Sequence, residues 1–211
     1  MGISERKERQ RAELRERIVS AAREMVVREG FAALSMRKLA EAIEYAPATL
    51  YLHFESREDL ARELSVRGFQ QLLEFLSPAA RVEEPVERLA EVARAYVRFG
   101  LEQPETYRLI FMEDPKLTTA LFGEGQDDLG AKAFALLVKP LEELKAGGRL
   151  AADADTRQLA EVLWAGVHGI VSLKLTCAGF QGTAADVLTS TLVTTFFHGL
   201  PGLAGAQSPR G

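Results

Sequence analysis

Apolar residues recur every three or four positions through most of the chain, which is the spacing of one face of an α-helix. In the first such segment, Leu14, Ile18, Ala21 and Met25 repeat in this way, with arginine and glutamate between them, as far as Gly30. Strict alternation of apolar and polar residues is nowhere sustained, so no strand is predicted. The pattern predicts an all-α protein of about nine helices, at residues 8–29, 36–43, 47–53, 57–76, 85–101, 105–112, 127–146, 156–178 and 183–199.

Proline and glycine residues mark the breaks between these segments. Pro140 lies inside an otherwise good helical pattern and is expected to kink or divide that helix. The stretch Gly123–Gly130 is predicted to be a loop. The two ends, up to about Glu8 and from Pro201 onward, have no apolar face and are expected to be untethered.

The segment Leu34–Arg57, LSMRKLAEAIEYAPATLYLHFESR, has the pattern of a helix-turn-helix. Ser35 can cap a first short helix, a tight turn follows near Glu44, and Pro47 suits the first turn of a second helix. In this second helix Leu50 and Phe54 are four residues apart and can point into the domain. Its other residues are small or polar, so the helix is too poor in apolar residues to serve burial alone. We therefore predict that it enters the major groove of DNA.

The same segment resembles the DNA-binding signature of the tetracycline-repressor (TetR) family, in which the second helix typically runs T-L-Y-x-H-F. The match covers about residues 12–64. The resemblance implies DNA contacts from six residues, whose arginines and hydroxyls suit phosphate, and the chemistry of the groove adds Pro47 or Ala48 as a contact to a thymine methyl. The eight predicted contacts are Ser35, Arg37, Pro47, Ala48, Thr49, Tyr51, His53 and Arg57. The chain departs from the family in having Glu44 where glycine is usual and Ala46 where a capping serine is common.

The last two predicted helices are apolar on nearly every side, so each must be covered by its own bundle and by something else. We predict that they pair with their copies in a second chain as a four-helix interface. The predicted interface residues are Leu163, Gly166, Val167, Ile170, Leu188, Leu192 and Phe196.

Aromatic residues of the second half are expected to line a ligand pocket with a few polar groups. The run from Trp164 to His168-Gly169 resembles the regulatory domain of a TetR subgroup named for a Trp-His-Gly signature. His168 is equally well explained as a polar contact in the pocket or as a hydrogen-bonded core histidine. The predicted pocket residues are Leu72, Phe75, Tyr96, Phe99, Tyr107, Phe111, Trp164 and His168.

Charge and composition narrow the function further. The net charge is −4 and the excess of basic residues is confined to the N-terminal quarter, so any contact with nucleic acid must be local. The basic run Arg6–Arg11 is interleaved with glutamate, which favours a solvated helix start over a DNA-binding arm, although both remain open. The single cysteine, Cys177, lies in an apolar run and is expected to be buried.

No apolar stretch is expected to approach the roughly 18 residues that a membrane span requires, and we predict a cytoplasmic protein. The three histidines have no metal-like partners at helical spacing, and no catalytic set is apparent, so no metal, no cofactor and no enzyme activity are predicted.

These observations predict a DNA-binding domain at 1–56, a ligand-binding and dimerisation domain at 57–200 and a flexible tail at 201–211. The expected function is a dimeric regulator, most simply a repressor, that binds a palindromic operator in double-stranded DNA and is released by a small, largely apolar effector. Two alternatives stay open: a DNA-binding protein that answers to a protein partner or organises the chromosome without a ligand, and a helical enzyme that modifies small molecules.

Overall fold

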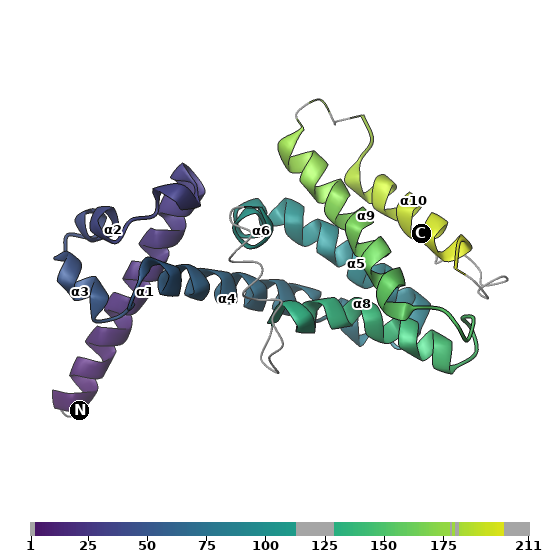
Figure 1. Cartoon of the computed structure of the whole chain (residues 1–211), viewed down its shortest axis with the longest axis horizontal. Coiled ribbons are helices and arrows are strands. Elements are labelled where there is room, and N and C mark those ends of the chain that lie inside the picture. Colours follow the sequence, from purple (N-terminus) through teal and green to yellow (C-terminus); the bar gives the residue numbers. More distant parts are fainter. Residues whose placement is uncertain (1–2, 113–128, 178, 180–181, 201–211) are drawn as a thin grey trace. The chain divides into compact units, whose positions relative to one another are not determined.

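The protein is all-α, as the sequence predicts. A computed structural model of the chain describes residues 3–112, 129–177, 179 and 182–200. Within these ranges it contains nine α-helices, two short 3-10 helices and no strand (Figure 1). Residues 123–128 of the predicted loop and the tail from Pro201 lie outside the described residues, whereas Leu129 and Gly130 are already part of a helix.

The chain divides into two compact units. The first comprises the described residues of Met1–Gly68 and Glu105–Gly123, and the second those of Phe69–Pro104 and Glu124–Gly211. The elements in chain order are α1 (Ile3–Glu29), η1 (Phe31–Ala33), α2 (Met36–Ala42), α3 (Pro47–Tyr51), α4 (Arg57–Leu76), η2 (Ala79–Arg81), α5 (Pro85–Glu102), α6 (Pro104–Phe111), α8 (Leu129–Ala146), α9 (Thr156–Thr176) and α10 (Ala185–His198). The predicted domain boundary at residue 57 thus differs from the division by contacts, because the first three turns of α4 and most of α6 pack with the N-terminal helices.

Helix ends follow local chemistry with a few departures from the predicted bounds. The Asp155 carboxylate accepts a hydrogen bond from the Gln158 amide at 3.0 Å and is therefore the N-terminal cap of α9. Ser35 occupies the cap position of α2, but its side chain makes no capping hydrogen bond, so the predicted side-chain cap is wrong. Pro140 lies within α8 without dividing it. The helix α1 begins at Ile3 rather than at residue 8, so the predicted loose end is helical.

The first unit has an apolar core built around α1. Ile18, Val19 and Ala22 of this helix are almost completely buried against residues of α2, α3 and α4, and Leu109 of α6 completes the cluster. Polar contacts tie the same helices together at the surface. Arg15 of α1 makes two hydrogen bonds, of 2.9 and 3.0 Å, to the Glu63 carboxylate of α4.

The charged cluster around Glu63 extends to a second arginine. Arg67 donates to Glu63 at 2.7 Å and to Glu16 at 2.6 and 2.7 Å. Hydrogen bonds from Arg15 and Arg67 outweigh partial burial and lower the pKa of Glu63 to about 2. These four side chains join α1 to α4 at the edge of the core.

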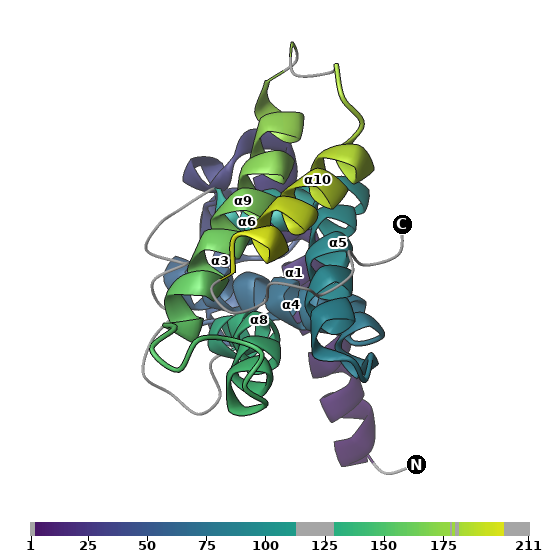
Figure 2. The same cartoon turned by 90° about the vertical axis from the view of Figure 1, so that its right-hand side faces the viewer.

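The second unit is a helical bundle organised by α5. This helix contacts α8, α9, α10 and η2, and α9 also packs against α8 and α10 (Figure 2). The inner side of α5 is apolar, and four of its residues have no exposed surface: Leu89, Ala90, Ala93 and Phe99. The Glu84 carboxylate caps α5 by accepting from the Glu87 amide at 2.8 Å.

Two expectations about the C-terminal helices are wrong. Cys177 is exposed, because α9 ends just before it and the apolar run continues no further as helix. The helix α9 is also long and apolar enough to cross a membrane by length and composition alone, although no such stretch was expected. Core helices of soluble proteins pass the same test, and only 28% of the apolar window is buried inside the structure.

Candidate nucleic-acid interface

The predicted helix-turn-helix consists of α2, α3 and the turn between them, and α2 and α3 contact each other. In the turn, the amide of Tyr45 donates to the carbonyl of Ala40 at 2.9 Å. Glu44 has a φ of 61°, and among the described residues it alone has positive φ without being glycine. This left-handed conformation costs a residue with a Cβ roughly 1 kcal/mol, so the turn forms at the expense of some backbone strain.

The helix α3 is only five residues long and depends on its anchors. It begins at Pro47 after Ala46, which provides no side-chain cap. Leu50 is 0% exposed and Phe54, just beyond the helix, is 1% exposed. The Arg15 guanidinium lies 4.6 Å from the centre of the Phe54 ring. An isolated helix of this length would not be stable in water, so burial of Leu50 and Phe54 holds the rest of α3 in place.

The side of α3 opposite these anchors is open to solvent. Pro47, Ala48 and Tyr51 are exposed, with Tyr51 retaining 53% of its surface, while Thr49 is half-buried. Arg37 of α2 is also exposed and bonds Glu41 at 3.1 Å, one turn along its own helix. Four of the eight predicted DNA contacts are thus accessible to solvent, and three of these four lie on the short helix α3. An exposed helix of this kind suits entry into a major groove.

Ser35 and His53 are less accessible. Ser35 is half-buried at the start of α2, and the Nδ1 atom of His53 is buried without a hydrogen-bond partner among the described residues. Burial, with smaller contributions from Arg11 and Arg15, lowers the pKa of His53 below its ordinary value. This shift favours the neutral imidazole, which suits a hydrogen bond to phosphate better than an ion pair.

Arg57 is engaged within the unit. One guanidinium nitrogen donates to the carbonyl of Phe31 at 2.9 Å, and the guanidinium lies 4.5 Å from the centre of the Phe31 ring. Its Nε atom is buried without a hydrogen-bond partner among the described residues. The side chain predicted to clamp phosphate thus holds η1 against the start of α4.

Two exposed residues and one long-range contact beside α3 were not predicted. Leu52 is 70% exposed and Tyr45 is 37% exposed, although both belong to apolar residue types. Arg11 of α1 donates to the carbonyl of Leu52 at 3.3 Å. The spacing from Leu50 turns Leu52 outward on a helix, so that signal was present in the sequence. The contact from Arg11, 41 residues away, left no local signal.

In the second unit, three of the predicted pocket residues form one polar cluster within apolar surroundings. The Trp164 indole N–H donates to the Tyr96 hydroxyl at 3.1 Å, and the same hydroxyl lies 3.1 Å from Nδ1 of His168. The Phe134 ring packs edge-on against Trp164 with centroids 6.1 Å apart, a contact that was not predicted. Burial lowers the pKa of His168, which favours the neutral imidazole.

The other predicted pocket residues form two further groups. Phe75 and Phe99 pack edge to face with centroids 5.6 Å apart, and Leu72, one turn before Phe75 on α4, is buried. Tyr107 and Phe111 pack on each other in α6 with centroids 4.9 Å apart, but they belong to the first unit. The structure therefore brings together Tyr96, Trp164 and His168, and separately the two phenylalanines.

Comparison with known families agrees with the geometry of both units. Residues 18–64 match the model of bacterial regulatory proteins of the tetR family, and residues 89–197 match that of the tetracyclin repressor-like C-terminal domain. The second match alone covers more than half of the chain. The chain belongs to the TetR family.

Relatives of this TetR protein carry the name of transcriptional regulators. It is 26% identical over 185 residues to the uncharacterized HTH-type transcriptional regulator Rv0681 of Mycobacterium tuberculosis, covering 85% of this chain and 76% of that protein. It is 28% identical over 96 residues to the uncharacterized regulator YobS of Bacillus subtilis, covering 46% of this chain and only half of the relative's length. The prediction of a regulator rather than an enzyme is thereby confirmed.

Solved TetR structures share the fold. FadR of Bacillus subtilis, solved in complex with stearoyl-CoA, superposes with a TM-score of 0.69 at 17% identity, covering 91% of this chain and 99% of that one. AibR, solved with isovaleryl coenzyme A and operator DNA, superposes with a TM-score of 0.63 at 20% identity, covering 86% of this chain and 96% of that one. Members of this fold thus bind DNA and ligands such as acyl-CoA.

The predicted interface residues of the TetR chain differ in accessibility. Leu163 and Val167 are 1% and 0% exposed in the single chain, so they have almost no surface left for a partner. A Cβ on Gly166 would meet the side chain of Leu192, which shows that α9 and α10 approach closely here within one chain. The remaining predicted residues are half-buried: Ile170, Leu188, Leu192 and Phe196.

Apolar surface that no part of the described chain covers lies nearby on the same two helices. Val162 and Leu173 of α9 are 58% and 41% exposed, and Val187 of α10 is 51% exposed. A Cβ added to Gly169, between the two α9 residues, would meet no atom within 4 Å. The predicted interface did not include these residues, because helical spacing cannot tell which apolar side of a helix faces its own bundle.

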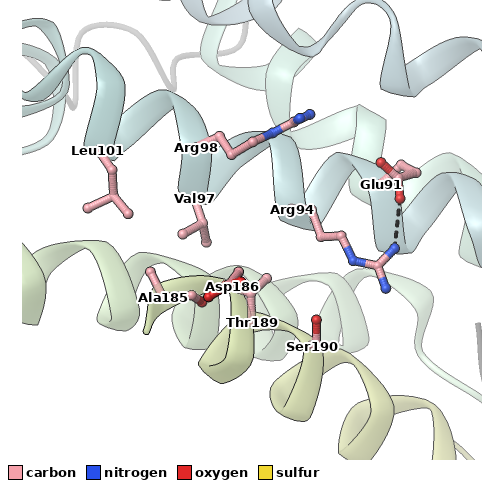
Figure 3. Close-up of a pocket in the computed structure, with 9 residues that line it drawn as sticks. All are labelled: Glu91, Arg94, Val97, Arg98, Leu101, Ala185, Asp186, Thr189 and Ser190. Atoms are coloured by element: carbon pink, nitrogen blue, oxygen red, sulfur yellow. Dashed lines mark hydrogen bonds and ion pairs between the residues drawn. The ribbon is translucent and has the colours of Figure 1, made fainter. Parts of the chain in front are cut away.

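A groove of about 260 Å³ lies between α5 and α10 of the second unit (Figure 3). Val97 and Leu101 give it an apolar wall, and Arg94 at its rim bonds Glu91 at 2.7 Å. None of the predicted pocket residues lines this groove. Among the described residues, no group of three histidine, cysteine, aspartate or glutamate side chains could hold a metal ion.

Proposed function

We propose that this TetR-family regulator is a repressor in the cytoplasm that binds a palindromic operator as a homodimer and leaves it when a small, largely apolar effector binds the second unit. The proposal that α3 recognises the base sequence of the operator rests on one observation. Leu50 and Phe54 anchor this helix, while Pro47, Ala48 and Tyr51 stay exposed. Side chains on such a face can contact base edges without disturbing the fold.

Within the interface, the residues have different roles. Arg37, Ser35 and Tyr51 donate to phosphate oxygens and set the register of α3 on the duplex. Thr49, Pro47 and Ala48 face base edges and thymine methyls. His53 acts as a neutral hydrogen-bonding group. Arg57 contributes through its hold on η1 and α4, and a direct phosphate contact from it stays a prediction.

The dimer forms through the exposed apolar surface of α9 and α10. Val162, Leu173 and Val187 supply this surface, and the open space at Gly169 lets a second helix approach closely. Covering apolar surface of this kind stabilises association by roughly 25 cal/mol per Å² before the entropic cost of association is subtracted. A two-fold dimer presents two copies of α3 to half-sites about 34–36 Å apart.

The effector binds near the cluster of Tyr96, Trp164 and His168. An apolar region with a few convergent polar groups is what small-molecule sites usually provide. Acyl-CoA thioesters are the first candidates to test, because FadR and AibR, which share the fold, were solved with such ligands. Tyr107 and Phe111 belong to the first unit and are not part of this proposed site.

Ligand binding changes operator affinity through the helices that link the units. The helix α4 begins in the first unit and ends in the second, and α6 returns to the first unit directly after α5. A ligand that prefers the non-binding arrangement by about 1–3 kcal/mol would shift the population by ordinary allosteric coupling.

The experiment begins by selecting genomic fragments that the purified protein binds, followed by titration of the selected duplex. The double variant Thr49→Ala with Tyr51→Ala is expected to lose roughly 30-fold or more in specific affinity, as two contacts of 1–3 kcal/mol each would give. Val27→Ala, an exposed truncation on α1, serves as the control and should bind normally.

Unchanged specific binding by the double variant would refute the role of α3. Candidate acyl-CoA thioesters are then added to the operator complex. Release of the duplex supports the effector model, whereas a complex insensitive to every ligand that demonstrably binds the second unit would favour control by a protein partner.

A further inference from the structure

The first three turns of α1 extend beyond the core of the first unit. Every described side chain from Ser4 to Glu13 is exposed, and packing begins only at Leu14. A helix of about ten residues without tertiary support is marginal in water. This one makes local contacts such as the bond from Ser4 to Glu8 at 3.3 Å, and Arg11 adds a hydrogen bond to the carbonyl of Leu52. These turns therefore add nothing to the apolar core.

The extension is directed past the end of α3. Arg17 of α1 donates to the carbonyl of Ile43 after α2 at 3.4 Å, and Arg11, closer to the N-terminus, donates to the carbonyl of Leu52 after α3 at 3.3 Å. Following α1 toward its N-terminus thus leads from the end of α2 to the end of α3 and then beyond it. Both views show the N-terminal turns projecting past the helix-turn-helix (Figures 1 and 2).

The two sides of the extension carry different basic residues. At 100° per residue, Lys7 lies within about 40° of Arg11 around the helix axis, whereas Arg6 lies about 140° away. Lys7 therefore continues the row of Arg11 and Arg15 that faces the recognition segment. Arg15 is bonded to Glu63 and Arg11 to a carbonyl, while Lys7 is exposed and has no bonding partner within the described parts of the chain.

We propose that Lys7 binds a phosphate of the operator outside the stretch contacted by α3, so that the N-terminal turns of α1 form a second DNA contact. Four residues beyond Arg11, its Cα lies about 6 Å further along the helix axis, and the flexible ammonium suits a point contact to phosphate. Such a contact adds affinity and salt dependence without reading sequence. This inference rests on the proposed operator binding.

The test compares Lys7→Gln with Arg6→Gln, which removes the same charge from the same turn but at a position about 100° around the helix axis from Lys7 and about 140° from Arg11. Each variant and the unchanged protein are titrated against the selected operator by fluorescence anisotropy between 50 and 300 mM salt. Lys7→Gln is expected to reduce the slope of log K against log salt concentration by about 0.9 per bound chain. Arg6→Gln should leave the slope unchanged, and both variants should melt like the unchanged protein because both positions are exposed.

A second arm shortens the duplex at both flanks. The unchanged protein should lose affinity when the outer base pairs are removed, whereas Lys7→Gln should be insensitive to their removal. Equal slopes and equal flank dependence for the two variants would overturn the inference while leaving operator binding intact. Absence of any sequence preference in the unchanged protein would instead refute the proposed function itself.

Discussion

Gly68 of α4 offers a test of the packing between α4 and α6 in the first unit. An exposed glycine in the middle of a helix is destabilising by about 0.5–1 kcal/mol relative to alanine, so helix propensity alone predicts that Gly68→Ala stabilises the protein. In the structure, however, a Cβ at this position would lie far inside van der Waals contact with Cγ2 of Ile110 and 3.4 Å from Cγ2 of Thr106.

The steric effect is expected to outweigh propensity. Ile110 is 1% exposed and its β-branched side chain has little rotational freedom in a helix. Overpacking of a buried site costs about 1–3 kcal/mol. When the gain in helix propensity is subtracted from this cost, Gly68→Ala should lower the free energy of unfolding by about 1–2 kcal/mol. Urea denaturation followed by circular dichroism measures the change.

Two substitutions of the neighbour identify the cause. Ile110→Ala removes the Cγ2 methyl and alone should cost about 2–4 kcal/mol, but in its presence Gly68→Ala should become neutral or stabilising. Ile110→Val keeps Cγ2, so Gly68→Ala should remain destabilising in that background. If Gly68→Ala stabilises the otherwise unchanged protein by 0.5–1 kcal/mol, as propensity alone would have it, the close approach of the two helices is refuted.

Substitutions at three other positions test separate features. Hydrogen bonds from its arginine partners lower the pKa of Glu63 to about 2, so its contribution to stability is complete above pH 4.5 and is lost as pH falls toward 2. In thermal melts Glu63→Gln should be about 1–2 kcal/mol less stable at pH 7 and should show a weaker loss of stability in acid. If the stability of the variant fell with pH as steeply as that of the unchanged protein, the pairing would be contradicted. Glu44→Gly should stabilise the protein by up to about 1 kcal/mol in urea denaturation by relieving the positive φ, whereas Glu44→Val should destabilise it; a stabilising valine would show that the turn is unstrained. Val162→Arg, at an exposed position on α9, should give a folded monomer by analytical ultracentrifugation if this surface forms the dimer, and a persistent dimer would place the interface elsewhere.

The sequence predicted the helices well because helical periodicity is a local property. The segment around Ile18 and Met25 shows its buried face through spacing alone, and both residues are buried in the structure. The start of α1 was missed because the first turns have no apolar face for periodicity to reveal. Cys177 was misjudged since an apolar run does not say where its helix ends.

The candidate site could be predicted only in part, for a related reason. Leu50 and Phe54 could be assigned as anchors from their spacing, and their burial confirms it. The hold of Arg57 on Phe31 and of Arg11 on Leu52 depends on which segments the fold brings together, and no local pattern encodes that. The same limit applies to Leu163, since periodicity shows that a helix side is apolar but not which neighbour covers it.

The division of α3 into an anchored and an open side has a consequence for how such regulators diversify. Substitutions at Pro47, Ala48 or Tyr51 remove little buried surface, so they can accumulate without lowering the free energy of unfolding. Changes at Leu50 or Phe54 would cost several kcal/mol in comparison. A lineage carrying this scaffold can therefore acquire a new target sequence by altering a few surface positions, and the same positions are the natural choice for an engineer who wishes to redirect it.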